Sequence, residues 1–140
     1  MRQKGSIACF KDDRDRDLMR AFREQLSLQK GEFNLSDILT ATINSPTSHF
    51  WVSIERAVVM IYKIRKGYDL AQMGDTRREM FKEIEKRVAE IERTHEGIKL
   101  EDAVIRVIEG GAPKFYLTIK SAKVILHKIK KRWRNGQLAI

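Results

Sequence analysis

Apolar residues recur along this chain at intervals of three and four positions, the spacing that places side chains on one face of an α-helix. Two stretches show the pattern most clearly, with apolar positions at Met19, Phe22 and Leu26 in the first, and at Phe81, Ile84, Val88 and Ile91 in the second. Stripes of this kind are typical of helices that bury one side in a protein core. The pattern therefore predicts helices rather than strands.

The chain also aligns with itself at an offset of 65 residues. Residues 49–66 match residues 114–131 without gaps, and seven positions are identical. The only two prolines, Pro46 and Pro113, fall in equivalent connectors of the two copies. Because a repeat implies that each copy is one structural unit, we predict three helices in repeat 1, about residues 14–67, and three in repeat 2, about residues 76–134.

A short aromatic stretch precedes the third helix of each repeat. Residues 50–52 and 115–117 have a strand-like composition, but they are only three residues long. Ser53 and Thr118 follow them and are suitable N-caps for the third helices. The predicted fold is therefore all-α, with two tandem repeats that share one core and short extended aromatic segments before the third helix of each.

The composition fits a single domain over residues 1–140, with flexible ends at 1–10 and 135–140. Of the residues, 42% are hydrophobic and 34% are charged, which is typical of a globular chain. Cys9 is the only cysteine, so an intramolecular disulfide and a cysteine-based zinc site are both excluded. We find no signal peptide and no apolar run of about 20 residues that could cross a bilayer. These features predict a cytoplasmic protein.

The net charge of the chain indicates a class of partner, which the composition alone does not. The chain has 28 Lys and Arg against 19 Asp and Glu, a formal net charge of +9, and such a surplus attracts polyanions. Residues 114–134 contain no acidic residue, and the last helix has one apolar and one cationic side. The apolar side comprises Ala122, Ile125, Leu126, Ile129 and Trp133, and the cationic side comprises Lys120, Lys123, His127, Lys130, Lys131 and Arg134.

This basic helix predicts binding of nucleic acid, with DNA as the expected partner. Lysines would follow the phosphate backbone, while Arg132 and Arg134 are the better candidates for contacts to base edges. The main alternative is a structural or assembly subunit of a phage particle or another complex, whose basic surface meets an acidic protein. A merely solvated face, a contact with an anionic membrane surface and a homo-oligomer also stay open.

No catalytic or metal-binding pattern emerges from the residue types. His49, His95 and His127 are far apart in sequence, and Cys9 lacks a neighbour that would activate it. The acidic residues from Asp13 onward follow calcium-loop spacing, but Leu18 stands where the loop requires glycine. We therefore predict a protein that is not an enzyme and that has no cofactor and no metal.

The stretch Ala112-Pro113-Lys114-Phe115-Tyr116-Leu117-Thr118-Ile119-Lys120-Ser121-Ala122-Lys123-Val124-Ile125 carries a resemblance. It is similar to short basic proteins of unknown function from bacteriophages and mobile elements of Bacteroidetes. The likeness covers this stretch and its counterpart in the first repeat. It implies a bacterial or phage-infected cell as the setting and brings no assigned activity.

Overall fold

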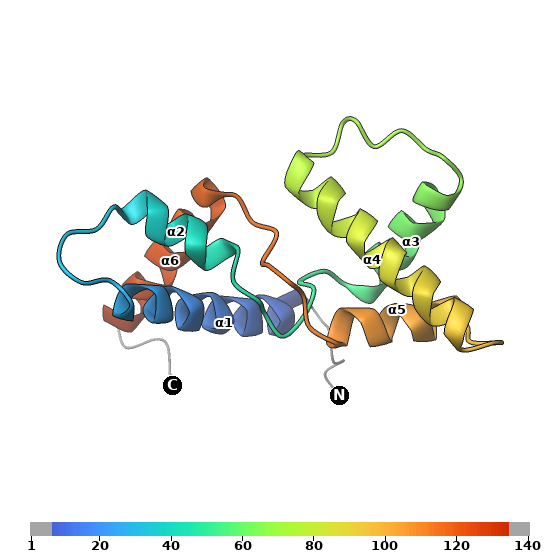
Figure 1. Cartoon of the computed structure of the whole chain (residues 1–140), viewed down its shortest axis with the longest axis horizontal. Helices are drawn as coiled ribbons and strands as arrows, with labels where there is room; N and C mark the ends of the chain where they lie inside the picture. Colours follow the sequence, from blue (N-terminus) through green and yellow to red (C-terminus); the bar gives the residue numbers. More distant parts are fainter. Residues whose placement is uncertain (1–6, 135–140) are drawn as a thin grey trace.

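Six α-helices make up the regular structure of residues 7–134, the part of the chain that the computed structural model describes (Figure 1). They are α1 (Ile7–Ser27), α2 (Leu35–Ile43), α3 (Ile54–Arg65), α4 (Asp75–Thr94), α5 (Leu100–Glu109) and α6 (Ile119–Arg134). No strand forms within these residues, so the all-α prediction is confirmed. Of the predicted flexible ends at 1–10 and 135–140, residues 1–6 and 135–140 lie outside the described part, and α1 begins at Ile7.

Polar side chains begin the third helix of each half, as the sequence predicts. The Ser53 hydroxyl accepts a hydrogen bond from the backbone N–H of Arg56 (3.1 Å) at the start of α3. At the start of α6, the Thr118 hydroxyl accepts one from the N–H of Ser121 (3.1 Å). Each bond satisfies one of the backbone donors that the first turn of a helix leaves without a partner.

The helices form two lobes that lie side by side (Figure 1). Helices α1, α2 and α6 pack together in one lobe, and α3, α4 and α5 pack together in the other. Among the described residues, the backbones of the helices of one lobe stay apart from those of the other, although the side chain of Phe10 on α1 packs against the core of α3, α4 and α5. The third helix of each half of the chain therefore completes the lobe of the opposite half.

Each lobe has its own hydrophobic core. One contains Leu18 and Phe22 from α1 together with Ile129 from α6, and the other contains Ile61 from α3 and Ile84 from α4. The sequence predicted one shared core, and this prediction is wrong. A helix with a single apolar stripe can bury that stripe against two neighbouring helices. Three helices therefore form most of each core, while Phe10 of α1 and residues of the connectors add to the core of α3, α4 and α5.

Two connectors cross between the lobes and are joined by backbone hydrogen bonds. The N–H of Thr47 donates to the carbonyl of Ala112 (3.0 Å), and the N–H of Ala112 donates back to Thr47 (2.8 Å), which forms an isolated antiparallel bridge. Thr47 and Ala112 are separated by the same 65 residues as the sequence alignment.

Two further backbone hydrogen bonds are related to each other by the same offset of 65 residues. The N–H of Phe50 donates to the carbonyl of Ile108 (3.0 Å), and the N–H of Phe115 donates to that of Ile43 (2.9 Å). Both the donors and the acceptors differ by 65 positions. The crossing is therefore locally twofold, and each connector is tied to the end of the second helix in the other half.

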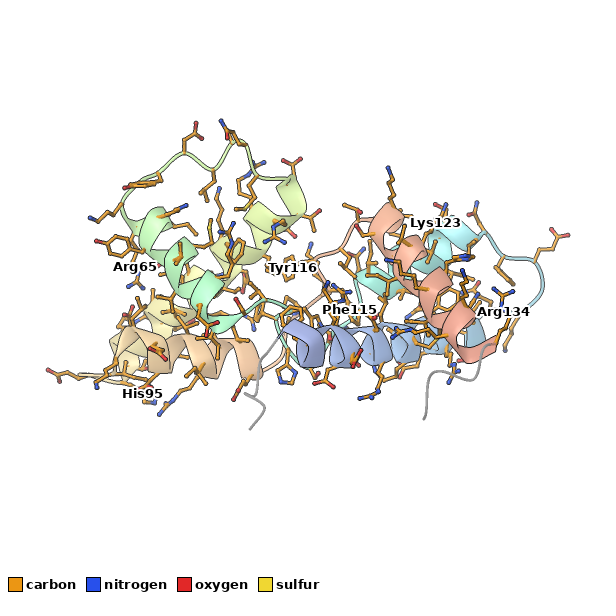
Figure 2. All side chains as sticks on the ribbon, turned by 180° about the vertical axis from the view of Figure 1, so that it is seen from behind. Arg65, His95, Phe115, Tyr116, Lys123 and Arg134 are labelled. Carbon is orange, nitrogen blue, oxygen red and sulfur yellow. The ribbon has the colours of Figure 1, made fainter. Side chains whose placement is uncertain are left out.

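The aromatic segments divide their side chains between the two cores. Phe115 is buried in the core of α1, α2 and α6, whereas the adjacent Tyr116 is buried in the other core and stacks on Phe50, with ring centroids 5.9 Å apart (Figure 2). Tyr116 has a φ of 55°, which is unusual for a residue with a side chain. Burial raises its pKa to about 12.

Asp17 of α1 fastens the first connector to its lobe. The carboxylate accepts hydrogen bonds from Arg20 Nε (2.6 Å), from the backbone N–H of Ser48 (3.2 Å) and from the Thr47 hydroxyl. The indole of Trp51 donates to the same hydroxyl (2.8 Å). Burial acts to raise the pKa of Asp17, but the three hydrogen bonds outweigh it and hold the pKa below its ordinary value.

Candidate nucleic-acid interface

Helix α6 is held by an apolar stripe that faces α1 and α2. Ala122, Leu126 and Ile129 are buried, and they recur at intervals of four and three residues. This spacing keeps one side of the helix against the core and turns the opposite side outward. Of the predicted apolar positions, Ile125 is half-buried, and the Trp133 side chain lies outside the described part of the structure.

Six of the seven predicted binding residues lie on the outward side of α6. They are all exposed, and two of them, Lys123 and Arg134, are labelled on α6 in Figure 2. The exposed six are Lys120, Lys123, His127, Lys130, Lys131 and Arg134. With a rise of about 1.5 Å per residue, they form a cationic strip about 21 Å long, which we call the α6 face.

The structure does not bring Arg132 onto the α6 face. Its side chain is half-buried, and its guanidinium forms an ion pair with Asp15 of α1 at 3.3 Å. Asp15 is also paired with Arg14 at 3.0 Å. This ion pair links α6 to α1, and the contact of Arg132 to base edges stays a prediction.

The carboxylates of α1 do not neutralise the α6 face. Asp17 and Glu24 both pair with Arg20, and Asp13 pairs with Arg16 of the same helix. Among the described residues, the lysines of the α6 face and Arg134 form no ion pair. Their charge is therefore available to a partner.

Charge is distributed unequally between the lobes. Residues 114–134 hold eight Lys and Arg and no acidic residue, whereas residues 48–112 hold twelve of each sign. In α3, the position equivalent to Lys130 is Arg65, which pairs with Glu85 (3.2 Å) and Glu92 (2.5 Å) of α4. Hydrogen bonding to Glu92 raises the pKa of Arg65. The lobe containing α6 thus accounts for most of the positive surplus.

The prediction left out exposed residues of α6, among them Lys128 and Val124. Lys128 extends the cationic strip toward one edge of the helix, and Val124 lies beside Lys120 and Lys131 with 48% of its surface exposed. Lys128 was left out because the predicted cationic side covers a narrower part of the helix circumference than the side that is exposed in the structure. The position of Val124 on a helical projection could have revealed an apolar patch within the α6 face.

The residues considered for chemistry are not brought together. His49 lies in the first connector, His95 at the end of α4 and His127 on α6. Within the described residues, no cluster of three or more His, Cys, Asp or Glu side chains could hold a metal ion. No helix in this part of the chain is long and apolar enough to span a membrane.

Compared with known proteins, the chain matches no family model, no curated sequence and no solved structure.

Proposed function

We propose that this chain is a non-enzymatic nucleic-acid-binding protein that grips the backbone of duplex DNA with the α6 face. The observation that supports this proposal is a row of exposed cations without ion-pair partners among the described residues. Lysine is a point charge on a flexible stem, so such a row favours phosphate contacts over the reading of base edges. The expected setting is the cytoplasm of a bacterial or phage-infected cell.

The strength of binding should depend steeply on salt. Lys120, Lys123, Lys130, Lys131 and Arg134 carry permanent charges, and each phosphate that is neutralised contributes about −0.9 to the slope of log K against log salt. Five contacts give a slope of about −4.5. Affinity for a short duplex should therefore fall about 500-fold between about 50 and 200 mM salt.

A charge-reversal variant tests the proposal. Lys123→Glu, Lys130→Glu and Lys131→Glu together should weaken duplex binding and flatten the salt slope while leaving helix content unchanged. The matched control is Lys86→Glu, Lys99→Glu and Arg106→Glu, three exposed cations of the other lobe. The control changes the net charge equally. If both variants lose the same affinity, general charge and not the α6 face is responsible.

The exposed Val124 favours a second candidate, in which the α6 face meets an acidic protein within an assembly. An apolar side chain among lysines suits an amphipathic acidic surface better than a phosphate backbone. Binding to an acidic polypeptide with no binding to duplex DNA, together with loss on Val124→Asp, would favour this candidate.

We also infer that the chain arose from a duplicated three-helix unit whose third helices are exchanged. The 65-residue offset of the aligned sequence recurs in four backbone hydrogen bonds, two between the connectors and two from a connector to the end of α5 or α2, which supports this inference. In the first copy the third helix holds Arg65 in ion pairs, and in the second copy it holds exposed lysines. Divergence after duplication would account for a chain with one basic lobe and one neutral lobe.

A further inference from the structure

An open hollow lies beside the loop that joins α3 to α4. Its volume is about 490 Å³, within the range of roughly 300–1,000 Å³ that is usual for small-ligand pockets. Arg56 and Lys63 of α3, Arg77 of α4 and Tyr68 of the loop contribute to its walls. We call it the α3–α4 groove. It belongs to the lobe that lacks a surplus of charge, so the α6 face does not explain it.

Hydrogen bonds hold the loop in a defined shape. The Arg78 guanidinium donates to the carbonyls of Leu70 (3.3 Å) and Met73 (3.0 Å), and the N–H of Tyr68 donates to the carbonyl of Lys63 (3.0 Å). Leu70 and Met73 are also packed against the core of this lobe. The ring of Tyr68 nevertheless keeps 58% of its surface exposed. A fixed but uncovered aromatic ring is suited to stacking.

The walls of the groove carry a local positive surplus. Arg56, Lys63 and Arg77 form no ion pair with any described residue, and the only acidic side chain that lines the groove is Asp69. The Asp69 carboxylate already accepts a hydrogen bond from the N–H of Ala71 (2.9 Å) within the loop. Three cations against one carboxylate favour an anionic ligand.

We propose that the α3–α4 groove binds single-stranded nucleic acid, with a base stacked on Tyr68 and the adjoining phosphates beside Arg56, Lys63 and Arg77. A cationic groove with an exposed aromatic ring is the usual arrangement for unpaired strands, because every base offers a π-face and every nucleotide a phosphate. A duplex keeps its bases stacked inside and cannot use the ring. This site goes beyond the duplex contact proposed for α6 and does not depend on it.

The test is binding of the full chain to a fluorescent oligonucleotide of about 10 thymidines, measured by anisotropy at about 200 mM salt, where backbone contacts are weakened. Tyr68→Ala should lower affinity by about 5- to 150-fold, the range for loss of one stacked base. Tyr68→Phe should retain it, because the ring is kept. Arg56→Gln with Lys63→Gln should lower affinity and flatten the salt dependence.

Tyr62 provides a matched control. It is an exposed tyrosine of the same lobe, with 54% of its surface uncovered, and it does not line the groove. Tyr62→Ala should leave the affinity for the oligonucleotide unchanged, and Tyr68→Ala should leave duplex binding unchanged. Equal losses from the two alanine variants, or no loss from Tyr68→Ala, would overturn the proposal. Neither result would affect the duplex contact of α6, which the charge reversal on that helix tests separately.

Discussion

The exchange of third helices makes a prediction that an unexchanged fold would not make. Ile61 of α3 and Ile129 of α6 are both buried in a core, with 0% and 1% of their surfaces exposed. Ile61 packs in the core formed with α4 and α5, whereas Ile129 packs in the core formed with α1 and α2. Replacing Ile61 or Ile129 with alanine should therefore destabilise the lobe whose other two helices come from the opposite half of the chain.

The expected loss in the free energy of unfolding is large for a lobe of this size. Replacing a buried isoleucine with alanine removes three carbon atoms and costs about 2–5 kcal/mol. A lobe of about 60 residues has a stability of about 3–9 kcal/mol at typical values per residue. A loss of about 3 kcal/mol increases the open population of the affected lobe about 150-fold.

Hydrogen exchange resolved by peptide is the suitable assay. In Ile129→Ala, exchange should accelerate in α1, α2 and α6 while α4 and α5 keep their protection, and Ile61→Ala should give the reverse pattern. Val124→Ala and Val59→Ala, at exposed positions of α6 and α3, serve as controls and should change little. Faster exchange in α4 and α5 on Ile129→Ala, or equal acceleration in both lobes, would refute the exchanged arrangement.

Three further predictions concern individual side chains. Asp17→Asn should cost about 1–3 kcal/mol in urea unfolding at neutral pH. Because the folded pKa of Asp17 is lowered, its contribution is present above the ordinary value of 3.8 and is lost as pH falls through the folded pKa, so the difference in stability between wild type and variant should shrink as the pH falls below 3.8. Ser53→Ala and Thr118→Ala should each cost about 1 kcal/mol through loss of an N-cap, and a thermal scan that shows neither loss would contradict the assigned caps. Tyr116 has a pKa raised from 10.0 to about 12, so stability should fall as pH rises through this interval, and Tyr116→Phe should remove that slope; phenolate absorbance gives the direct measurement.

Periodicity in the sequence was enough to predict the helices and the orientation of α6. Its buried stripe and exposed lysines follow from spacing alone, since a 3.6-residue repeat determines which side chains share a face. The prediction of six exposed residues on that face agrees with the structure. The ion pair of Arg132 could not be predicted, because its partner, Asp15, lies 117 positions earlier, and no local pattern reports such a contact.

The pairing of helices could not be predicted in the same way. The stripe on α3 would fit the helices of either half, because the two halves have similar apolar patterns. The connectors decide which pair of helices each third helix packs against, because they cross between the lobes and form hydrogen bonds with each other at Thr47 and Ala112. Hydrogen bonds of this kind involve backbone atoms, which carry no residue-specific signal, so one core and two cores looked alike in the sequence.

The division of the lobes along the chain has a consequence for synthesis. Helices α3, α4 and α5 come from one continuous segment, residues 54–109, so they can pack together as soon as α5 has left the ribosome, and Ala112 and Tyr116 join their core afterwards. Helices α1 and α2 are made first, yet their apolar surface waits for α6, which is translated after every other helix. The same late segment covers that surface and carries the α6 face, so a chain arrested before α6 would leave the apolar surface of α1 and α2 exposed and would lack the surface proposed to bind DNA.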